Sequence, residues 1–300
     1  MGSRAQGAMG LLQASRQRPR VDFNGFNQAR PLARLVNRVL LFLLLVPATT
    51  WGGLQDWQKD LSSSGPGAFP LPREQIAIYH FGWSRFIHAG EAAATFTKPK
   101  PDILQLDVKG GSIGLVRDLW RLDASHKAVA RASTLRPLRI KQTEVYASKT
   151  VSTSLTFNAH GVSSMRTVTP PDPVPPKVQK FTFPSVYDLQ TALIYFRSQR
   201  LLPGDRLSLV VYPANTPYLV TIRVIGREQI QVKAGNYSAL KLELYLQRIN
   251  NQLGLEAHNK FKRAFAWISD DSNRSLLRVE AEIFVGSVWA ELQSVKFTGR

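Results

Sequence analysis

The chain has 300 residues, of which 44% are hydrophobic and 10% aromatic, and it carries a formal net charge of +18 and no cysteine. This apolar content is sufficient for a packed core and excludes global disorder, while the lack of cysteine excludes disulfides, thiolate metal ligands, a thiol nucleophile and a thioether lipid anchor. The excess of positive charge predicts an anionic partner surface, such as lipid headgroups.

Residues 1–48 have the composition of an export leader. Arg34 and Arg38 precede the apolar run 39–46, and the sequence then continues through Pro47 to Ala48. This run is too short to span a bilayer, which needs about 20 residues, and a basic flank before a short apolar segment is typical of a signal peptide. We therefore expect cleavage near Ala48 and a mature periplasmic protein that is not a lipoprotein.

The remainder divides into a linker and one β domain. Residues 49–72 are predicted to be a linker, because the stretch from Asp60 to Pro72 is rich in serine, glycine and proline. Residues 73–300 are predicted to form the domain. Runs of β-prone residues in its first part predict strands at 76–83, 89–96, 103–108, 128–133, 138–146, 150–158 and 162–169.

Two segments interrupt this series of strands. A short helix is expected near 114–122, with Leu115, Leu119 and Leu122 on one side. The proline-rich segment 170–176 cannot join a sheet ladder, so it is predicted to be a stiff connector inside the domain.

A second helix is predicted at residues 188–198. Leu189, Leu193 and Phe196 recur at i, i+4 and i+7, which places them on one helical face. Asp188 directly precedes them and can accept hydrogen bonds from the free N–H groups of the first turn.

Beyond this helix the hydrophobic period changes to two. The alternating apolar positions are Tyr218, Val220, Ile222 and Val224 in one run, and Leu240, Leu242, Leu244 and Leu246 in the next. Such alternation indicates a sheet with one covered face. With further strands at 263–268, 277–285 and 288–297, the predicted fold is mostly β. It is an antiparallel open half-barrel of about ten or more strands, with helix 188–198 packed at its mouth.

Several dispersed positions carry a family resemblance. They are Asp188, Tyr195, Arg197, Asp205, Glu228, Gly235, Trp267, Asp270, Asp271 and Arg278 with their neighbours. In order and spacing they resemble the signature of a bacterial envelope family, "domain of unknown function 3108". The resemblance implies an exported β domain similar in outline to the open barrels of lipoprotein carriers such as LolA and LolB. It implies no catalytic residues.

The half-barrel leads to an expectation about function. An open barrel with a helix at its mouth leaves an apolar trough that can hold a lipid or acyl chain. The candidate lining residues are Tyr79, Trp83, Tyr195, Leu240, Leu242 and Leu244. We therefore expect an exported, non-enzymatic binding module without cofactor, acting as a monomer. An envelope scaffold that docks on another protein is the alternative.

Other chemistry receives less support from the sequence. Gly110-Gly-Ser112-Ile-Gly114 matches the G-x-S-x-G pattern, so a serine hydrolase on Ser112 remains a remote alternative, although the pattern belongs to parallel sheets. The five histidines lack the spacing of a metal site, and no nucleotide-binding loop is present. Export also argues against a nucleic-acid partner.

Charged residues within the apolar stretches are expected to be structural. Arg197 and Arg278 are predicted to form ion pairs, with Asp205, Glu228 or Asp270 as candidate partners. Asp270 and Asp271 are predicted to form a turn rather than a carboxylate pair, because neighbours in an extended chain point to opposite faces.

Overall fold

The structure is a computed structural model and describes residues 56–62, 65–84, 86–170, 175–257, 261–283 and 286–299. The predicted signal peptide with its cleavage point near Ala48, and residues 171–174 of the predicted connector, lie outside these residues. No helix within the described part of the chain has the length and apolarity needed to cross a membrane.

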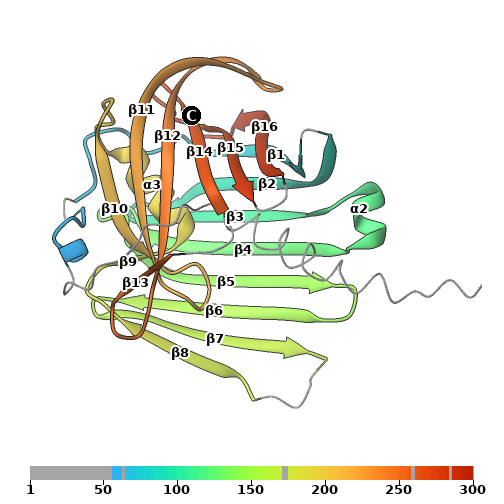
Figure 1. The fold of residues 1–300 in the computed structure, drawn as a ribbon, viewed down its shortest axis with the longest axis vertical. Coiled ribbons are helices and arrows are strands. Elements are labelled where there is room, and N and C mark those ends of the chain that lie inside the picture. Colours follow the sequence, from blue (N-terminus) through green and yellow to red (C-terminus); the bar gives the residue numbers. More distant parts are fainter. Residues whose placement is uncertain are drawn as a thin grey trace, which may run out of the picture.

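The described residues form one sheet of 16 strands (Figure 1). The strands are β1 (Gln75–Trp83), β2 (Ile87–Lys100), β3 (Ile103–Ser112), β4 (Leu122–Arg131), β5 (Pro137–Tyr146), β6 (Thr150–Asn158), β7 (Gly161–Thr169), β8 (Lys177–Thr182), β9 (Val186–Tyr187), β10 (Arg206–Val211), β11 (Tyr218–Val232), β12 (Gly235–Ile249), β13 (Leu255–Ala257), β14 (Phe261–Ser269), β15 (Leu276–Ile283) and β16 (Ser287–Phe297).

The strand order makes the sheet open. It runs β8-β7-β6-β5-β4-β3-β2-β1-β16-β15-β14-β12-β11-β10-β9, with β13 beside β12. All pairings are antiparallel except the short one between β9 and β10. Since β1 pairs with β16, the two ends of the domain meet inside the sheet and its free edges are β8 and β9. The predicted mostly-β, open half-barrel is confirmed.

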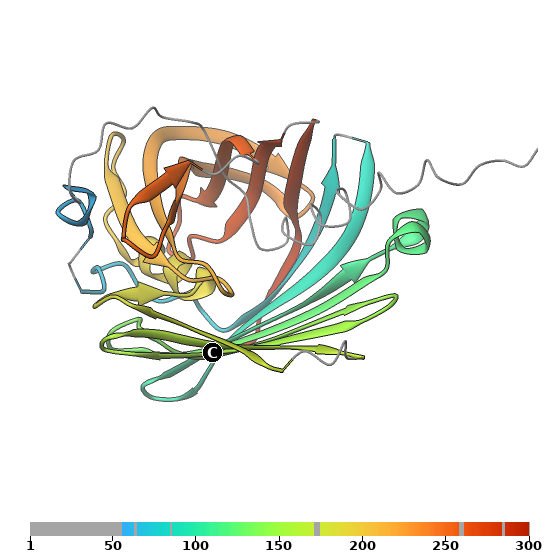
Figure 2. The same cartoon turned by 60° about the horizontal axis from the view of Figure 1, so that its bottom comes forward.

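The sheet is strongly curled on one side and flatter on the other (Figure 2). Strands β9 to β12, β14 to β16, β1 and β2 curl into a barrel-like wall, while β4 to β8 spread as a flatter layer. A hydrophobic cluster joins the two parts, with Leu155 and Phe157 of β6 packing with Val210 and Leu219. Gln142 of β5 also donates a 2.6 Å hydrogen bond to the carbonyl of Pro213.

Helix α3 (Leu189–Ser198) lies against the concave face of the curl (Figure 1). Asp188 is fully buried, and its Oδ1 accepts hydrogen bonds from the N–H groups of Gln190 and Thr191 at 2.8 and 3.0 Å. The predicted N-cap is therefore confirmed. Because its Oδ2 also accepts from the Thr191 hydroxyl at 2.6 Å, the buried carboxylate is fully engaged.

Helix α2 (Gly114–Leu119) is shorter than the predicted helix, and its apolar residues do not share a buried side. Leu115 and Leu119 are 73% and 74% exposed, whereas Leu122 begins β4 and is buried. The predicted apolar face is wrong, because the six-residue helix ends at Leu119 and the chain is extended from Trp120, so Leu122 cannot join the same face.

The described part of the predicted linker is packed on the barrel. A short 3-10 helix, Asp56–Gln58, brings Trp57 against Phe183 with 5.6 Å between ring centroids, and the indole donates to the carbonyl of Leu253 at 3.0 Å. Farther along, the N–H of Phe69 donates to the carbonyl of Ser198. The segment thus reaches the C-terminal end of α3.

Candidate functional site

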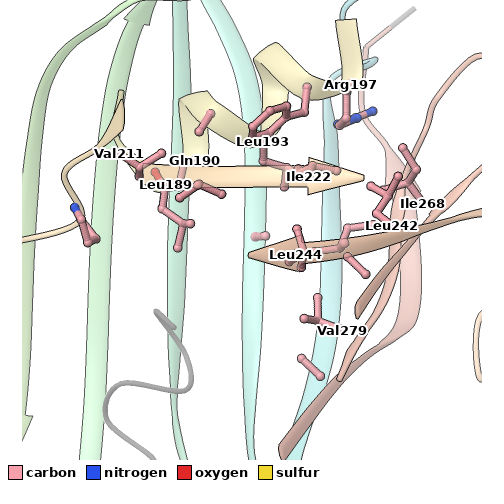
Figure 3. A pocket seen from close by; sticks show the side chains of 18 of the residues that line it. Leu189, Gln190, Leu193, Arg197, Val211, Ile222, Leu242, Leu244, Ile268 and Val279 are labelled. Atoms are coloured by element: carbon pink, nitrogen blue, oxygen red, sulfur yellow. The ribbon is translucent and has the colours of Figure 1, made fainter. Parts of the chain in front are cut away.

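A cavity of about 300 Å³ lies between α3 and the concave face of the sheet (Figure 3). The helix contributes Leu189, Leu193 and Phe196, the face predicted from the i, i+4, i+7 spacing. The opposite wall comes from strands on both sides of the β1–β16 junction, including Ala92 of β2 on one side and Val279 of β15 on the other. The predicted amphipathic pattern therefore places one apolar helical face over an apolar sheet face.

The cavity exists because small side chains stand opposite the helix. Ala92 and Ala94 of β2, Ala266 of β14 and Ala290 of β16 line it. Leucine or isoleucine at these positions would fill much of the space, because protein interiors are otherwise close-packed. Alternation along β2 explains the geometry, since residues two apart point to the same face of a strand.

Three of the six predicted lining residues border the cavity. Tyr79 lines it from β1, and Leu242 and Leu244 line it from β12. The Tyr79 hydroxyl donates a 2.9 Å hydrogen bond to the carbonyl of Leu276. Burial raises the pKa of Tyr79 above its usual value, so its hydroxyl stays protonated.

The other three predicted lining residues belong to the packed core. Leu240 and Tyr195 are 0% exposed, and Trp83 packs against the same core cluster. Tyr195 follows Leu193 by two positions, which on a helix is close to the opposite side, and it contacts Tyr187 with 5.2 Å between ring centroids. None of these three residues borders the cavity.

Arg197 is a buried cation at the cavity wall. It lies near the C-terminal end of α3, is 7% exposed, and its Nε is buried without a hydrogen-bond partner (Figure 3). Burial lowers its pKa to about 10, with Tyr79 and Asp271 opposing and Arg274 adding to that effect. Because this value is well above 7, the guanidinium remains charged at neutral pH.

The predicted ion pair of Arg197 is absent among the described residues. Asp205 accepts a 2.8 Å hydrogen bond from the N–H of Leu202, Glu228 pairs with Lys241 at 3.3 Å, and Asp270 pairs with Arg227. All three candidate carboxylates are therefore engaged elsewhere. The sequence could not show this, because partner choice depends on which strands become neighbours.

The second predicted ion pair forms with a different partner. Arg278 of β15 contacts Glu291 of β16 at 2.6 Å, because these residues face each other across the two strands. The same guanidinium donates to the carbonyl of Gln231 at 3.0 Å. This pair links β15, β16 and β11.

Most of the remaining signature residues stabilise turns or strand pairs. Asp271 forms the predicted turn, with Oδ1 accepting from Ser269, Asn273 and Arg274. Gly235 has a φ of +141° at the turn between β11 and β12, a backbone conformation that favours glycine. Trp267 is 5% exposed, and its indole N–H donates a hydrogen bond to the carboxylate of Glu228. Among the signature residues, Arg197 is the one that lines the cavity.

Ser112 makes a local structural contact. It is 2% exposed, and its hydroxyl accepts from the N–H of Leu122 at 3.0 Å and lies 3.5 Å from the Leu122 carbonyl. The G-x-S-x-G segment does fall between a strand and a helix, but both neighbouring strands are antiparallel to β3. This is not the parallel sheet in which a nucleophile elbow forms.

The β1–β2 hairpin brings together two histidines and a carboxylate that sequence spacing did not connect. The potential ligand atoms of His80, His88 and Glu91 lie within 4.8 Å of one another. However, the two rings stack with centroids 4.1 Å apart and planes 29° apart. Ring nitrogens bind metals in the plane of the ring, so stacked rings do not direct both lone pairs to one ion. We therefore propose no metal site at this cluster.

The fold and cavity define a β-barrel-like protein with an apolar interior under a helix. The family model "Protein of unknown function (DUF3108)" matches residues 75–293, and the chain belongs to this family. The match confirms the resemblance and extends from β1 into β16. No curated protein matches the chain.

Solved structures show a similar fold at low identity. A β-barrel-like protein of domain of unknown function DUF1849 from Brucella abortus is 8% identical with a TM-score of 0.50, over 77% of this chain and 100% of that one. A putative lipoprotein from Parabacteroides distasonis is 9% identical with a TM-score of 0.33, over 78% and 100%. A putative exported protein with a YmcC-like fold from Bacteroides fragilis is 10% identical with a TM-score of 0.31, over 77% and 99%. The likeness to the Brucella abortus structure supports the β-barrel-like fold and nothing about function.

Proposed function

We propose that this protein is an exported, non-catalytic envelope protein that binds one acyl chain, or a molecule with a comparable apolar chain, beneath α3. The observation that carries the proposal is the cavity of about 300 Å³, whose wall is almost entirely apolar. Small-molecule sites are typically about 300–1,000 Å³ and mostly apolar with a few polar groups. The cavity has both properties.

The free energy of burying apolar groups favours occupation of the cavity by an acyl chain. Each methylene group of a ligand that is removed from water contributes about 0.8 kcal/mol to the free energy of binding. Water in the cavity would lose hydrogen bonds that the apolar wall cannot replace. Leu193, Leu242 and Leu244 meet in the cavity from the helix and the sheet, so a flexible chain would contact both sides. No covalent chemistry is required of the lining residues.

Export is the second part of the proposal and rests on the leader. Arg34 and Arg38 before the apolar run 39–46 are the features that support it. N-terminal sequencing of the protein from fractionated producing cells tests this part. We expect a periplasmic form that begins at Thr49; a full-length protein in the cytosol would contradict export.

The binding part is tested with a neutral, environment-sensitive dye, N-phenyl-1-naphthylamine, on protein freed of lipid by organic washing. We expect saturable binding of one dye per chain and its displacement by hexadecanol. Absence of saturable binding, or dye that hexadecanol does not displace, would contradict the proposal. A heat-unfolded sample controls for dye adsorbed to exposed apolar surface.

One observation favours a protein-interaction role as the second candidate. Strand β8 is a free edge of the sheet, and Val178 on it is 56% exposed. Free edges can pair with a strand of another protein, although Lys177 and Lys180 on the same short strand are typical of edges protected from such pairing. A photo-crosslinking residue at Val178 would capture such a partner in intact cells, and a uniform absence of adducts would remove this candidate.

A further inference from the structure

Among the described residues that line the cavity, Arg197 is the one with a charged side chain. Its residue exposure is 7%, so little of the guanidinium reaches bulk water. The Nε atom has no hydrogen-bond partner, and no ion pair joins the guanidinium to a carboxylate of the described residues. This cation has therefore been moved out of water without a directly paired counter-ion among the described residues.

None of the charged or ionisable groups nearest to Arg197 forms an ion pair with it among the described residues. Arg274 is itself a cation, and its Nη1 donates to main-chain carbonyls. The carboxylate of Asp271 favours the charged guanidinium through space, but it accepts hydrogen bonds within its own turn and forms no ion pair with Arg197. Tyr79 stays protonated and donates its hydroxyl to Leu276. An isolated buried charge is strongly unfavourable, whereas a buried charge that is paired and hydrogen-bonded is tolerated.

We propose that the ligand of the cavity is an acyl chain that ends in a carboxylate, and that Arg197 binds this carboxylate. The inference rests on the proposed function, since it assigns the head group of the chain that the cavity holds. The apolar residues of α3 and β12 would contact the chain, while the guanidinium at the C-terminal end of α3 would neutralise its acid.

The charge balance of the site favours a monoanion. Within the described part of the chain a single guanidinium lines the cavity, so one negative charge is neutralised and a second would remain buried and unpaired. The planar guanidinium also matches a carboxylate, because two N–H groups can donate to two oxygens in parallel. A phosphate monoester with nearly two charges would fit this balance less well.

The test compares ligands that share one chain and differ in the head group. Displacement of N-phenyl-1-naphthylamine is measured with hexadecanoic acid, hexadecanol and hexadecyl phosphate, at a pH where the acid is ionised. For the unaltered protein we expect the acid to bind about 10- to 100-fold more tightly than the alcohol, the range expected for hydrogen bonds to a charged group. We also expect the phosphate to bind more weakly than the acid.

Variants then assign the preference to Arg197. Arg197→Met keeps an unbranched apolar side chain and removes the charge, so the acid and the alcohol should bind equally while the affinity for the alcohol is retained. Arg197→Lys keeps the charge without the planar fork and should give an intermediate preference. Arg139→Met, on the exposed side of β5, is the matched control and should behave like the unaltered protein.

A second readout does not depend on binding. Because Arg197→Met removes an unpaired buried charge, the ligand-free variant should unfold at the same or a higher urea concentration than the unaltered protein. If Arg197 served only a structural role as one partner of an ion pair, Arg197→Met would instead unfold at a lower urea concentration. A clearly lower midpoint for Arg197→Met would therefore overturn the inference.

The outcomes separate this inference from the proposed function. If the acid and the alcohol displace the dye equally in the unaltered protein, the cavity binds chains but Arg197 does not bind their acid, and the inference is overturned alone. If none of the three ligands displaces the dye, both are overturned. If hexadecyl phosphate binds more tightly than the acid, the site is anion-binding and the choice of carboxylate is overturned.

Discussion

Arg274 holds the C-terminal end of the helix that carries Arg197. Its Nη1 donates a 2.6 Å hydrogen bond to the main-chain carbonyl of Arg197 and another to that of Gln199. The guanidinium also lies over the ring of Phe69, 3.4 Å from its centroid. A cation at a helix C-terminus is favourable because the last carbonyls have no partner within the helix. The turn between β14 and β15 thereby positions the end of α3 at the cavity.

Arg274→Met is expected to lower the free energy of unfolding by about 2 kcal/mol, because two buried carbonyls lose a charged donor. It should also weaken dye binding, since the last turn of α3 carries Phe196 of the cavity wall. Urea unfolding and dye titration check both effects. Arg206→Met, at an exposed arginine of β10, is the control, and equal behaviour of the two variants would show that the contact does not position the helix.

The N-cap of α3 gives a second prediction. Asp188→Ala removes a fully buried carboxylate that accepts from two N–H groups and one hydroxyl, so we expect a loss of about 1–2 kcal/mol in the free energy of unfolding. Asp188→Ser retains a capping oxygen and should lose less. Urea midpoints distinguish the two, and an alanine variant as stable as the unaltered protein would argue against the cap.

Two neighbouring alanines of β2 offer a matched pair for the cavity. Ala94 lines it, whereas Ala93 is the next residue and points to the other face of the strand. Ala94→Phe should occupy part of the cavity and weaken dye binding by about tenfold or more, an effect of about 1.4 kcal/mol or more. Ala93→Phe should bind the dye normally. Similar binding by both variants would place the dye outside the cavity.

Stability should depend on pH through His126. Burial lowers its pKa to about 4, from 6.5, and its Nε2 is buried without a partner. The unfolded chain therefore binds more protons than the folded one between these values, and the free energy of unfolding should decrease as the pH falls from 6.5 toward 4. In His126→Leu this decrease should be smaller. Parallel urea titrations at several pH values test it, and identical pH profiles would contradict it.

Local patterns were sufficient to predict much of the fold. The alternation in 240–246 indicated a strand with one buried face, and the cap and spacing at 188–198 indicated the helix; both are confirmed. These features depend on neighbours in the chain, which a sequence displays directly.

The cavity depended on relationships that the sequence does not display. Alternation correctly placed Leu240, Leu242 and Leu244 on one face, but it could not show that Leu240 packs in the core while the other two border a space. That difference arises from the alanines on β2, β14 and β16 that come to lie opposite the helix. The missing partner of Arg197 likewise became visible only once Asp205, Glu228 and Asp270 were seen in other contacts.

The central claim, that the cavity holds a single acyl chain, is tested most directly by native mass spectrometry of the protein purified without detergent from its producing cells. We expect a species heavier than the chain alone by the mass of one long-chain acid, which is lost on organic extraction and regained with added hexadecanoic acid. A bare chain mass that hexadecanoic acid does not shift would contradict it.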